Sequence, residues 1–114
     1  MENLCSVEGQ LVAYNNHDLD GYLVHFTDDV TGYDLDREAE LFASKSAMAD
    51  IYRKLFDAGV IFCEIANRMV LGRTVIDHER LFKGGVASGE AIVMYTLAED
   101  GRICGMRITR GQPQ

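Results

Sequence analysis

The pattern of hydrophobic positions changes at Gly59 and divides the chain into two parts. Before Gly59, apolar residues recur at steps of three and four, which is typical of helices that bury one face. After it, the period becomes two, as in strands whose successive side chains point to opposite faces. The pattern therefore predicts an α+β fold, with helices first and a sheet after them.

Two helices are predicted at the beginning of the chain. The first spans about residues 2–15, and its apolar face is Leu4, Val7, Leu11 and Tyr14. Asp18 can cap the second, because a carboxylate accepts hydrogen bonds from the free N–H groups of a helix start. The apolar side of this short helix is Leu19, Tyr22, Leu23 and Phe26. The pair Asp28-Asp29 is expected to end it.

A strand and a polar loop are predicted next. Val30 opens the strand, which carries Tyr33 and Asp34 on opposite faces. Residues 34–40 have no apolar stripe, so we interpret them as a loop that could border a pocket, followed by a short strand at about residues 41–43.

A third helix precedes the sheet. Ser44 or Ser46 caps it, and Gly59 ends it as a left-handed residue would. Its apolar face is Met48, Ile51, Tyr52, Leu55 and Phe56. Four strand segments separated by turns then predict an antiparallel meander: about residues 60–69, 73–82, 89–97 and 102–110.

The third of these strands is apolar on both faces. Ala91, Val93 and Tyr95 lie on one face, and Ile92 and Met94 on the other. A sheet covered on one side only would alternate cleanly between apolar and polar residues. Because the three helices cover one face, we expect a second copy of the chain to cover the other, giving a homodimer.

Length and composition indicate one domain over residues 1–114, with no cofactor motif. The net charge is −7, and the chain has no cluster of Lys and Arg with interleaved aromatic residues, so nucleic acid is not an expected partner. No apolar run is long enough for a membrane span, and no signal peptide opens the chain. These features predict a cytoplasmic protein.

The three cysteines are widely separated in the sequence and form no CxxC pair: Cys5, Cys63 and Cys104. This spacing argues against a disulfide framework and against a zinc site. We expect the thiols to be reduced.

Two sequence motifs resemble those of the ketosteroid isomerase-like superfamily, which includes the SnoaL-like and nuclear transport factor-like proteins. One is Asn16-His17-Asp18-Leu19-Asp20-Gly21 followed by Phe26-Thr27-Asp28-Asp29-Val30, and the other is Asp100-Gly101-Arg102-Ile103. The resemblance covers nearly the whole chain. It implies a cone-shaped, cystatin-like fold in which three N-terminal helices pack on a strongly curved, mostly antiparallel sheet around an apolar cavity.

The resemblance also implies roles for particular positions. The general base of the isomerases falls on Asp34, whereas their two oxyanion donors fall on Gln10 and Val93. Tyr52 matches a tyrosine that supports the oxyanion donor, and Tyr14 lies one helical turn after Gln10. Because two of the three catalytic positions differ, authentic steroid isomerisation is not expected.

The segment from Asp77 to Arg80 contains four consecutive ionisable residues within a predicted strand. Alternation puts Asp77 and Glu79 on one face and His78 and Arg80 on the other. Either pair could supply an acid–base group to a pocket. Alternatively, the charges could prevent edge-to-edge association of an edge strand, or they could form ion pairs across a dimer interface. Since the acidic residues and His78 alternate faces, they cannot all reach one metal ion.

We therefore predict a pocket for a small hydrophobic molecule, with proton-transfer chemistry of the isomerase, cyclase or hydrolase type and Asp34 as the catalytic base. The predicted ligand-binding residues are Tyr14, Tyr52, Asp77, His78, Glu79, Val93 and Met106. No cofactor is expected. The alternative is a non-catalytic dimeric module of the same fold that binds a ligand or a partner.

Overall fold

The computed structural model describes residues 4–112, in which helices and strands follow the predicted order. The N-terminal elements are α1 (Cys5–Asn15), α2 (Leu19–Leu23), β1 (Phe26–Asp34), β2 (Ala39–Phe42) and α3 (Lys45–Ala58). The remaining elements are β3 (Ile61–Leu71), β4 (Thr74–Lys83), β5 (Val86–Leu97) and β6 (Ile103–Gly111). None of the helices within residues 4–112 is long and apolar enough to cross a membrane.

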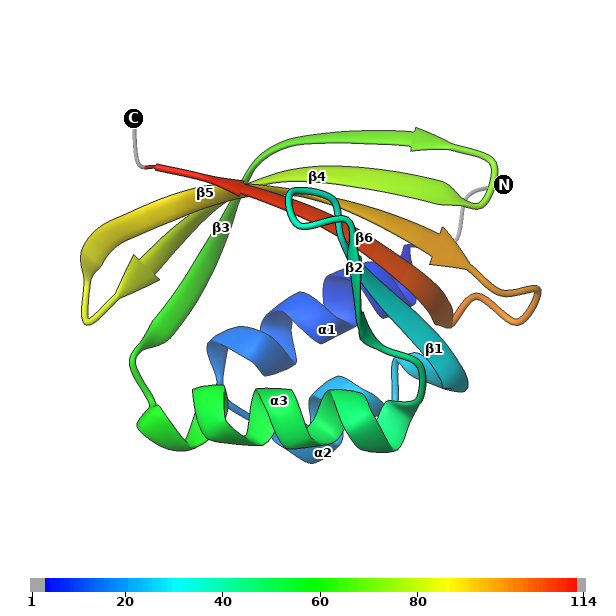
Figure 1. Ribbon diagram of the computed structural model, residues 1–114, viewed down its shortest axis with the longest axis horizontal. Coiled ribbons are helices and arrows are strands. Elements are labelled where there is room, and N and C mark those ends of the chain that lie inside the picture. Colours follow the sequence, from blue (N-terminus) through cyan, green and yellow to red (C-terminus); the bar gives the residue numbers. More distant parts are fainter. Residues whose placement is uncertain (1–3, 113–114) are drawn as a thin grey trace.

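One curved sheet, in the order β2-β1-β6-β5-β4-β3, arches over the helices. Only the β1–β6 pairing is parallel, and β3 to β6 form the predicted antiparallel meander. Figure 1 shows all three helices on the concave side of the sheet, with α1 beneath its centre. The α+β class and the cone-shaped arrangement are therefore confirmed.

The predicted helix ends agree with the local geometry. A side-chain oxygen of Asp18 accepts a hydrogen bond from the Gly21 N–H at 3.1 Å. Ser44, rather than Ser46, caps α3, because its hydroxyl accepts from the Ala47 N–H at 3.1 Å. Gly59 adopts φ = +67° at the end of α3, a conformation that costs glycine little because it has no Cβ.

The prediction that the second helix continues to Phe26 and ends at Asp28-Asp29 is wrong. The helix ends at Leu23, and Phe26 already pairs with Ile103 of β6 in β1. Phe26 is fully buried, and the N–H of Ile103 donates to the carbonyl of His25 at 2.9 Å. A strand distant in the sequence thus decides the conformation of this segment.

Other boundaries differ by a few residues from the prediction. β2 begins at Ala39, within the predicted loop, and β5 begins at Val86 rather than Gly89. The first helix begins at Cys5, and residues 2 and 3 of the predicted helix lie outside the described residues. Pairing with neighbouring strands extends β2 and β5 beyond their apolar segments.

The core lies between the helices and the concave face of the sheet. An aromatic cluster joins the three helices, with Tyr22 4.9 Å from Tyr52 and 5.3 Å from Phe56 between ring centroids. The strands contribute inward-facing residues to this core, including Val75, Val93, Tyr95, Met106 and Ile108. The aromatic contacts hold the helices together below the sheet and leave space between α1, α3 and the strands.

The convex face of the sheet has no helix over it (Figure 1). Several large apolar side chains remain exposed on β3 and β5: Phe62, Met69, Leu71, Ile92 and Met94. An exposed apolar patch on a sheet is a feature of interaction surfaces.

Candidate functional site

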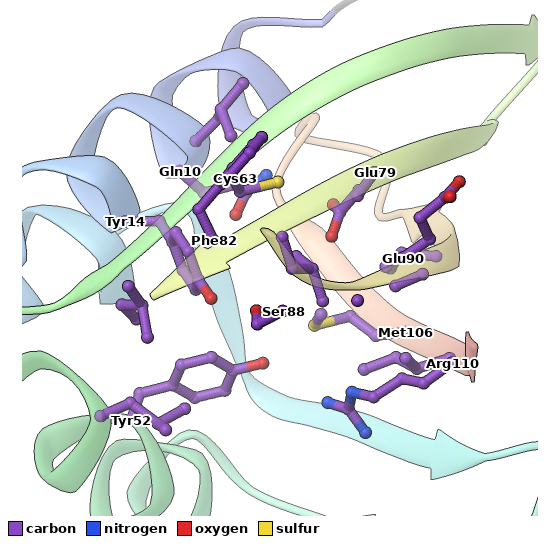
Figure 2. Close-up of a pocket in the computed structure, with 18 of the residues that line it drawn as sticks. Gln10, Tyr14, Tyr52, Cys63, Glu79, Phe82, Ser88, Glu90, Met106 and Arg110 are labelled. Carbon is purple, nitrogen blue, oxygen red and sulfur yellow. The ribbon is translucent and has the colours of Figure 1, made fainter. Parts of the chain in front are cut away.

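A cavity of about 370 Å³ lies between α1, α3 and the concave face of β3 to β6 (Figure 2). Its wall is mostly apolar, with residues such as Leu55, Ile61, Leu81, Val93 and Met106. The polar residues of the lining are Gln10, Tyr14, Tyr22, Tyr52, Cys63, Glu79, Lys83, Ser88, Glu90, Tyr95 and Arg110. An apolar cavity with a few polar groups is the usual form of a small-molecule site.

Five of the predicted site residues line this cavity. They are Tyr14, Tyr52, Glu79, Val93 and Met106. Tyr14 comes from α1 and Tyr52 from α3, whereas the other three come from β4, β5 and β6. The fold thus brings together residues that are far apart in the sequence.

Glu79 is the buried carboxyl group of the cavity, with 8% of its surface exposed. The hydroxyl of Tyr95 donates to Oε2 of Glu79 at 3.4 Å, and Nε2 of Gln10 donates to the same hydroxyl at 3.2 Å. The thiol of Cys63 lies beside the carboxyl (Figure 2). These contacts orient the Glu79 side chain within the cavity wall.

Burial raises the pKa of Glu79 to about 7, and the negative charge of Asp77 adds to the shift. Hydrogen bonds from Cys63 and Tyr95 and the positive charge of Arg110 oppose it. A carboxyl group with such a pKa can both release and accept a proton near neutral pH.

Asp77 lies on the same face of β4 but does not line the cavity. It is fully buried, and Arg68 holds it with two hydrogen bonds, Nε to Oδ1 at 2.6 Å and Nη2 to Oδ2 at 2.9 Å. Because Arg68 engages both carboxylate oxygens, Asp77 is not available to bind a ligand, but its negative charge still raises the pKa of Glu79.

The tyrosines supply hydroxyl groups to the wall. Burial raises the pKa of both Tyr14 and Tyr52, so both hydroxyls keep their protons at neutral pH. The Tyr14 ring packs edge-on against Phe56 at 5.6 Å between centroids. Both hydroxyls can donate a hydrogen bond to a ligand oxygen.

Asp34 does not line the cavity, contrary to the expectation that it faces the interior of the cone. Its Oδ1 accepts hydrogen bonds from the backbone N–H groups of Asp36 at 2.9 Å and Arg37 at 3.2 Å. The Arg37 guanidinium lies 3.8 Å from Oδ2. The side chain is buried because it caps the turn after β1, as aspartates at strand ends commonly do.

His78 does not line the cavity either. It faces the convex side, where its ring contacts Glu90 and Asn67. Glu79 and Asp77 point toward the helices, so the predicted alternation along β4 is correct, and only the acidic pair faces inward. Within residues 4–112, no three His, Cys, Asp or Glu side chains are grouped as metal ligands would be.

A family model described as "SnoaL-like domain" matches residues 7–106 of the chain. The chain belongs to the SnoaL-like domain family. No curated protein matches the sequence.

Solved structures share the fold of this SnoaL-like domain at low sequence identity. A cystatin fold protein from Novosphingobium aromaticivorans superposes with a TM-score of 0.81 at 20% identity, over 95% of this chain and 97% of that chain. A candidate ketosteroid isomerase from Kribbella flavida superposes with a TM-score of 0.81 at 7% identity, over 96% of this chain and 78% of that chain. The epoxide hydrolase/cyclase-like enzyme SalBIII has a role in pyran ring formation in the polyether salinomycin. It superposes with a TM-score of 0.80 at 17% identity, over 93% of this chain and 88% of that chain.

The cavity residues of the SnoaL-like domain that were not among the predicted site residues include four polar ones: Gln10, Cys63, Tyr95 and Arg110. The strand period could have indicated two of them. Tyr95 lies two positions after Val93, and Arg110 lies four after Met106, so each shares a face with a predicted residue. Cys63 required knowledge of which face of β3 points inward.

Proposed function

We propose that this SnoaL-like domain is an enzyme that transfers a proton within a compact, mostly apolar molecule, with Glu79 as the acid–base group. The observation that carries the proposal is the placement of one buried carboxyl, with a pKa of about 7, in the wall of an apolar cavity. A carboxylate with a pKa near neutral is a stronger base than an ordinary surface carboxylate and is still partly ionised at neutral pH.

The reaction begins with ionised Glu79 and a substrate that has an acidic C–H bond beside a carbonyl group. The carboxylate takes the proton, and the electrons of the C–H bond move onto the carbonyl oxygen. The hydroxyl of Tyr14 or Tyr52 donates a hydrogen bond to that oxygen as its negative charge develops. Glu79 then returns the proton to carbon. Glu79 and the tyrosines supply all the proton donors and acceptors, so the scheme needs no cofactor.

In this scheme Glu79 takes the role that the resemblance assigns to Asp34. The carboxylate of Asp34 is already engaged by two backbone N–H groups. Those contacts hold the Asp34 side chain in the turn and outside the cavity lining. The open volume of the cavity favours a small-molecule occupant over a module whose interior is filled by its own side chains.

Deuterium uptake at the carbon beside the carbonyl of 2-indanone, followed by NMR in deuterated buffer, tests the proposal. We expect the wild-type protein to accelerate uptake and Glu79→Gln to lose about a hundredfold or more of that acceleration. Asp34→Asn is the matched control and should keep most of it. Equal rates for the wild-type protein and Glu79→Gln would contradict the assignment of Glu79.

We also propose that the protein is a homodimer in which the convex faces of the two sheets meet. Support comes from the exposed apolar side chains on β3 and β5, which no described part of the chain covers. Burying them would remove apolar surface from water. We further propose a cytoplasmic location, supported by the wide spacing of the cysteines in the sequence, which does not suit a disulfide framework.

A further inference from the structure

Glu79, Ala91 and Arg110 form one row across the concave face of the sheet. Glu79 pairs with Ala91 between β4 and β5, and Ala91 pairs with Arg110 between β5 and β6. Adjacent strands lie about 5 Å apart, so the backbones of Glu79 and Arg110 are separated by roughly 10 Å. The small side chain of Ala91 between them leaves the floor of the cavity open.

The Arg110 guanidinium is directed toward the cavity (Figure 2), and it is one of the lining groups. Its side chain forms no ion pair or hydrogen bond with any residue in the described range 4–112. The positive charge of Arg110 lowers the pKa of the Glu79 and Asp36 carboxyls, although neither carboxylate forms an ion pair with the guanidinium. Lys83, also without an ion pair among these residues, adds a second positive charge to the lining.

The backbone of Arg110 is held in place by the loop after β1. Oδ2 of Asp36 accepts from the Arg110 N–H at 2.9 Å, and Oδ1 accepts from the Thr109 hydroxyl at 2.6 Å. Asp34 caps the turn that contains Asp36. The Asp36 carboxylate therefore contacts the Arg110 backbone and the Thr109 hydroxyl, and the Arg110 guanidinium remains available to a ligand.

We propose that the cavity takes an organic carboxylate, whose apolar body lies over Ala91 and whose carboxylate group binds Arg110. The planar guanidinium matches a carboxylate with two parallel hydrogen bonds, which gives it direction as well as charge. The other end of the molecule then reaches Glu79. A reaction of Glu79 with this ligand depends on the proposed function. The anion site does not, because it depends only on the position of Arg110 in the cavity lining.

Isothermal titration calorimetry with 2-naphthoate and its neutral amide, 2-naphthamide, tests this proposal, because the two molecules share size and shape. We expect the wild-type protein to bind the carboxylate more tightly, and Arg110→Gln to weaken carboxylate binding about tenfold without changing amide binding. Arg107→Gln is the matched control. Arg107 lies on the same strand but over the ring of Tyr33, 5.9 Å from its centroid, and outside the cavity lining.

The proposal is overturned if the carboxylate and the amide bind equally, if Arg110→Gln keeps the preference, or if neither binds at millimolar concentration. The Glu79→Gln variant separates the acid–base role of Glu79 from the anion site at Arg110. Because this variant keeps Arg110, it should still bind 2-naphthoate more tightly than 2-naphthamide. If that variant binds 2-naphthoate normally and also retains full deuterium exchange, the acid–base assignment fails while the anion site stands.

Discussion

The chemistry of the cavity depends on what surrounds each ionisable side chain. Glu79 and Asp77 are two positions apart on β4, yet Arg68 neutralises Asp77 whereas Glu79 has only uncharged donors in contact with it. Burial without a partner charge favours the protonated form of a carboxyl, and an ion pair favours the ionised form. Two similar residues on one strand face therefore have different roles.

The raised pKa of Glu79 predicts how stability changes with pH. The folded protein holds a proton on Glu79 up to a pKa of about 7, whereas the unfolded chain releases it near the ordinary value of 4.5. The free energy of unfolding therefore falls as pH rises between these values, by about 3 kcal/mol in total, and the loss is complete above pH 7.

Glu79→Gln should remove this dependence, because glutamine does not ionise. Urea denaturation at a series of pH values from about 4.5 to 8 measures it, and we expect the variant to surpass the wild-type protein in stability at the upper end. Cys63 and Tyr95 beside Glu79 should contribute little in this range, because burial raises the pKa of both and keeps them protonated. If the free energy of unfolding changes with pH in the same way for both proteins, the prediction is wrong.

At the scale of elements, β1 and β2 are held together by a close contact between a glycine and an aromatic ring. Gly32 pairs with Phe42 across the two strands, and the Phe42 ring lies where a side chain at position 32 would be. Phe42 is itself buried in the core, so its ring has little room to move. This contact fixes the approach of β2 to the sheet.

Gly32→Ala should therefore destabilise the protein by about 1–3 kcal/mol, the usual cost of overpacking a core. Thermal and urea denaturation measure the change. Gly105→Ala on the neighbouring strand is the control, since an added Cβ there meets atoms no nearer than 3.7 Å. If both variants have the same stability, the contact with Phe42 does not constrain β2.

At the scale of the whole molecule, the two faces of the sheet differ in what covers them. The concave face carries the core and the cavity, whereas the convex face exposes apolar residues near its centre, among them Ile92 with 46% of its surface accessible. A second copy that packs on this face would leave the cavity and its polar residues on the opposite side. Dimerisation and ligand binding can therefore occur together.

We expect the wild-type protein to elute as a dimer at micromolar concentration in size-exclusion chromatography with light scattering. Ile92→Glu should shift the mass to that of a monomer, because a charge would be buried at the interface. Val12→Glu, on the exposed side of α1 with 62% of Val12 accessible, is the control and should remain dimeric. A monomeric wild-type protein would refute the interface.

The order of elements, the cap at Asp18, the end of α3 at Gly59 and the alternation from Asp77 to Arg80 could be predicted from the sequence, which left the α3 cap open between Ser44 and Ser46. They depend on neighbours only a few residues away along the chain. Five of the eight predicted site residues also line the cavity, because strand and helix periods indicate which side chains share a face.

The sequence by itself determined the family, the fold class and the placement of Asp77 and Glu79 on one face of their strand, whereas the tertiary structure decided that this face points inward. Only the tertiary structure decided that Phe26 belongs to a strand, that Asp34 caps a turn, and that Glu79 stands in one row with Arg110. The reason is physical: strand pairing, burial and electric field arise between residues that are distant in the sequence and meet only in the folded chain.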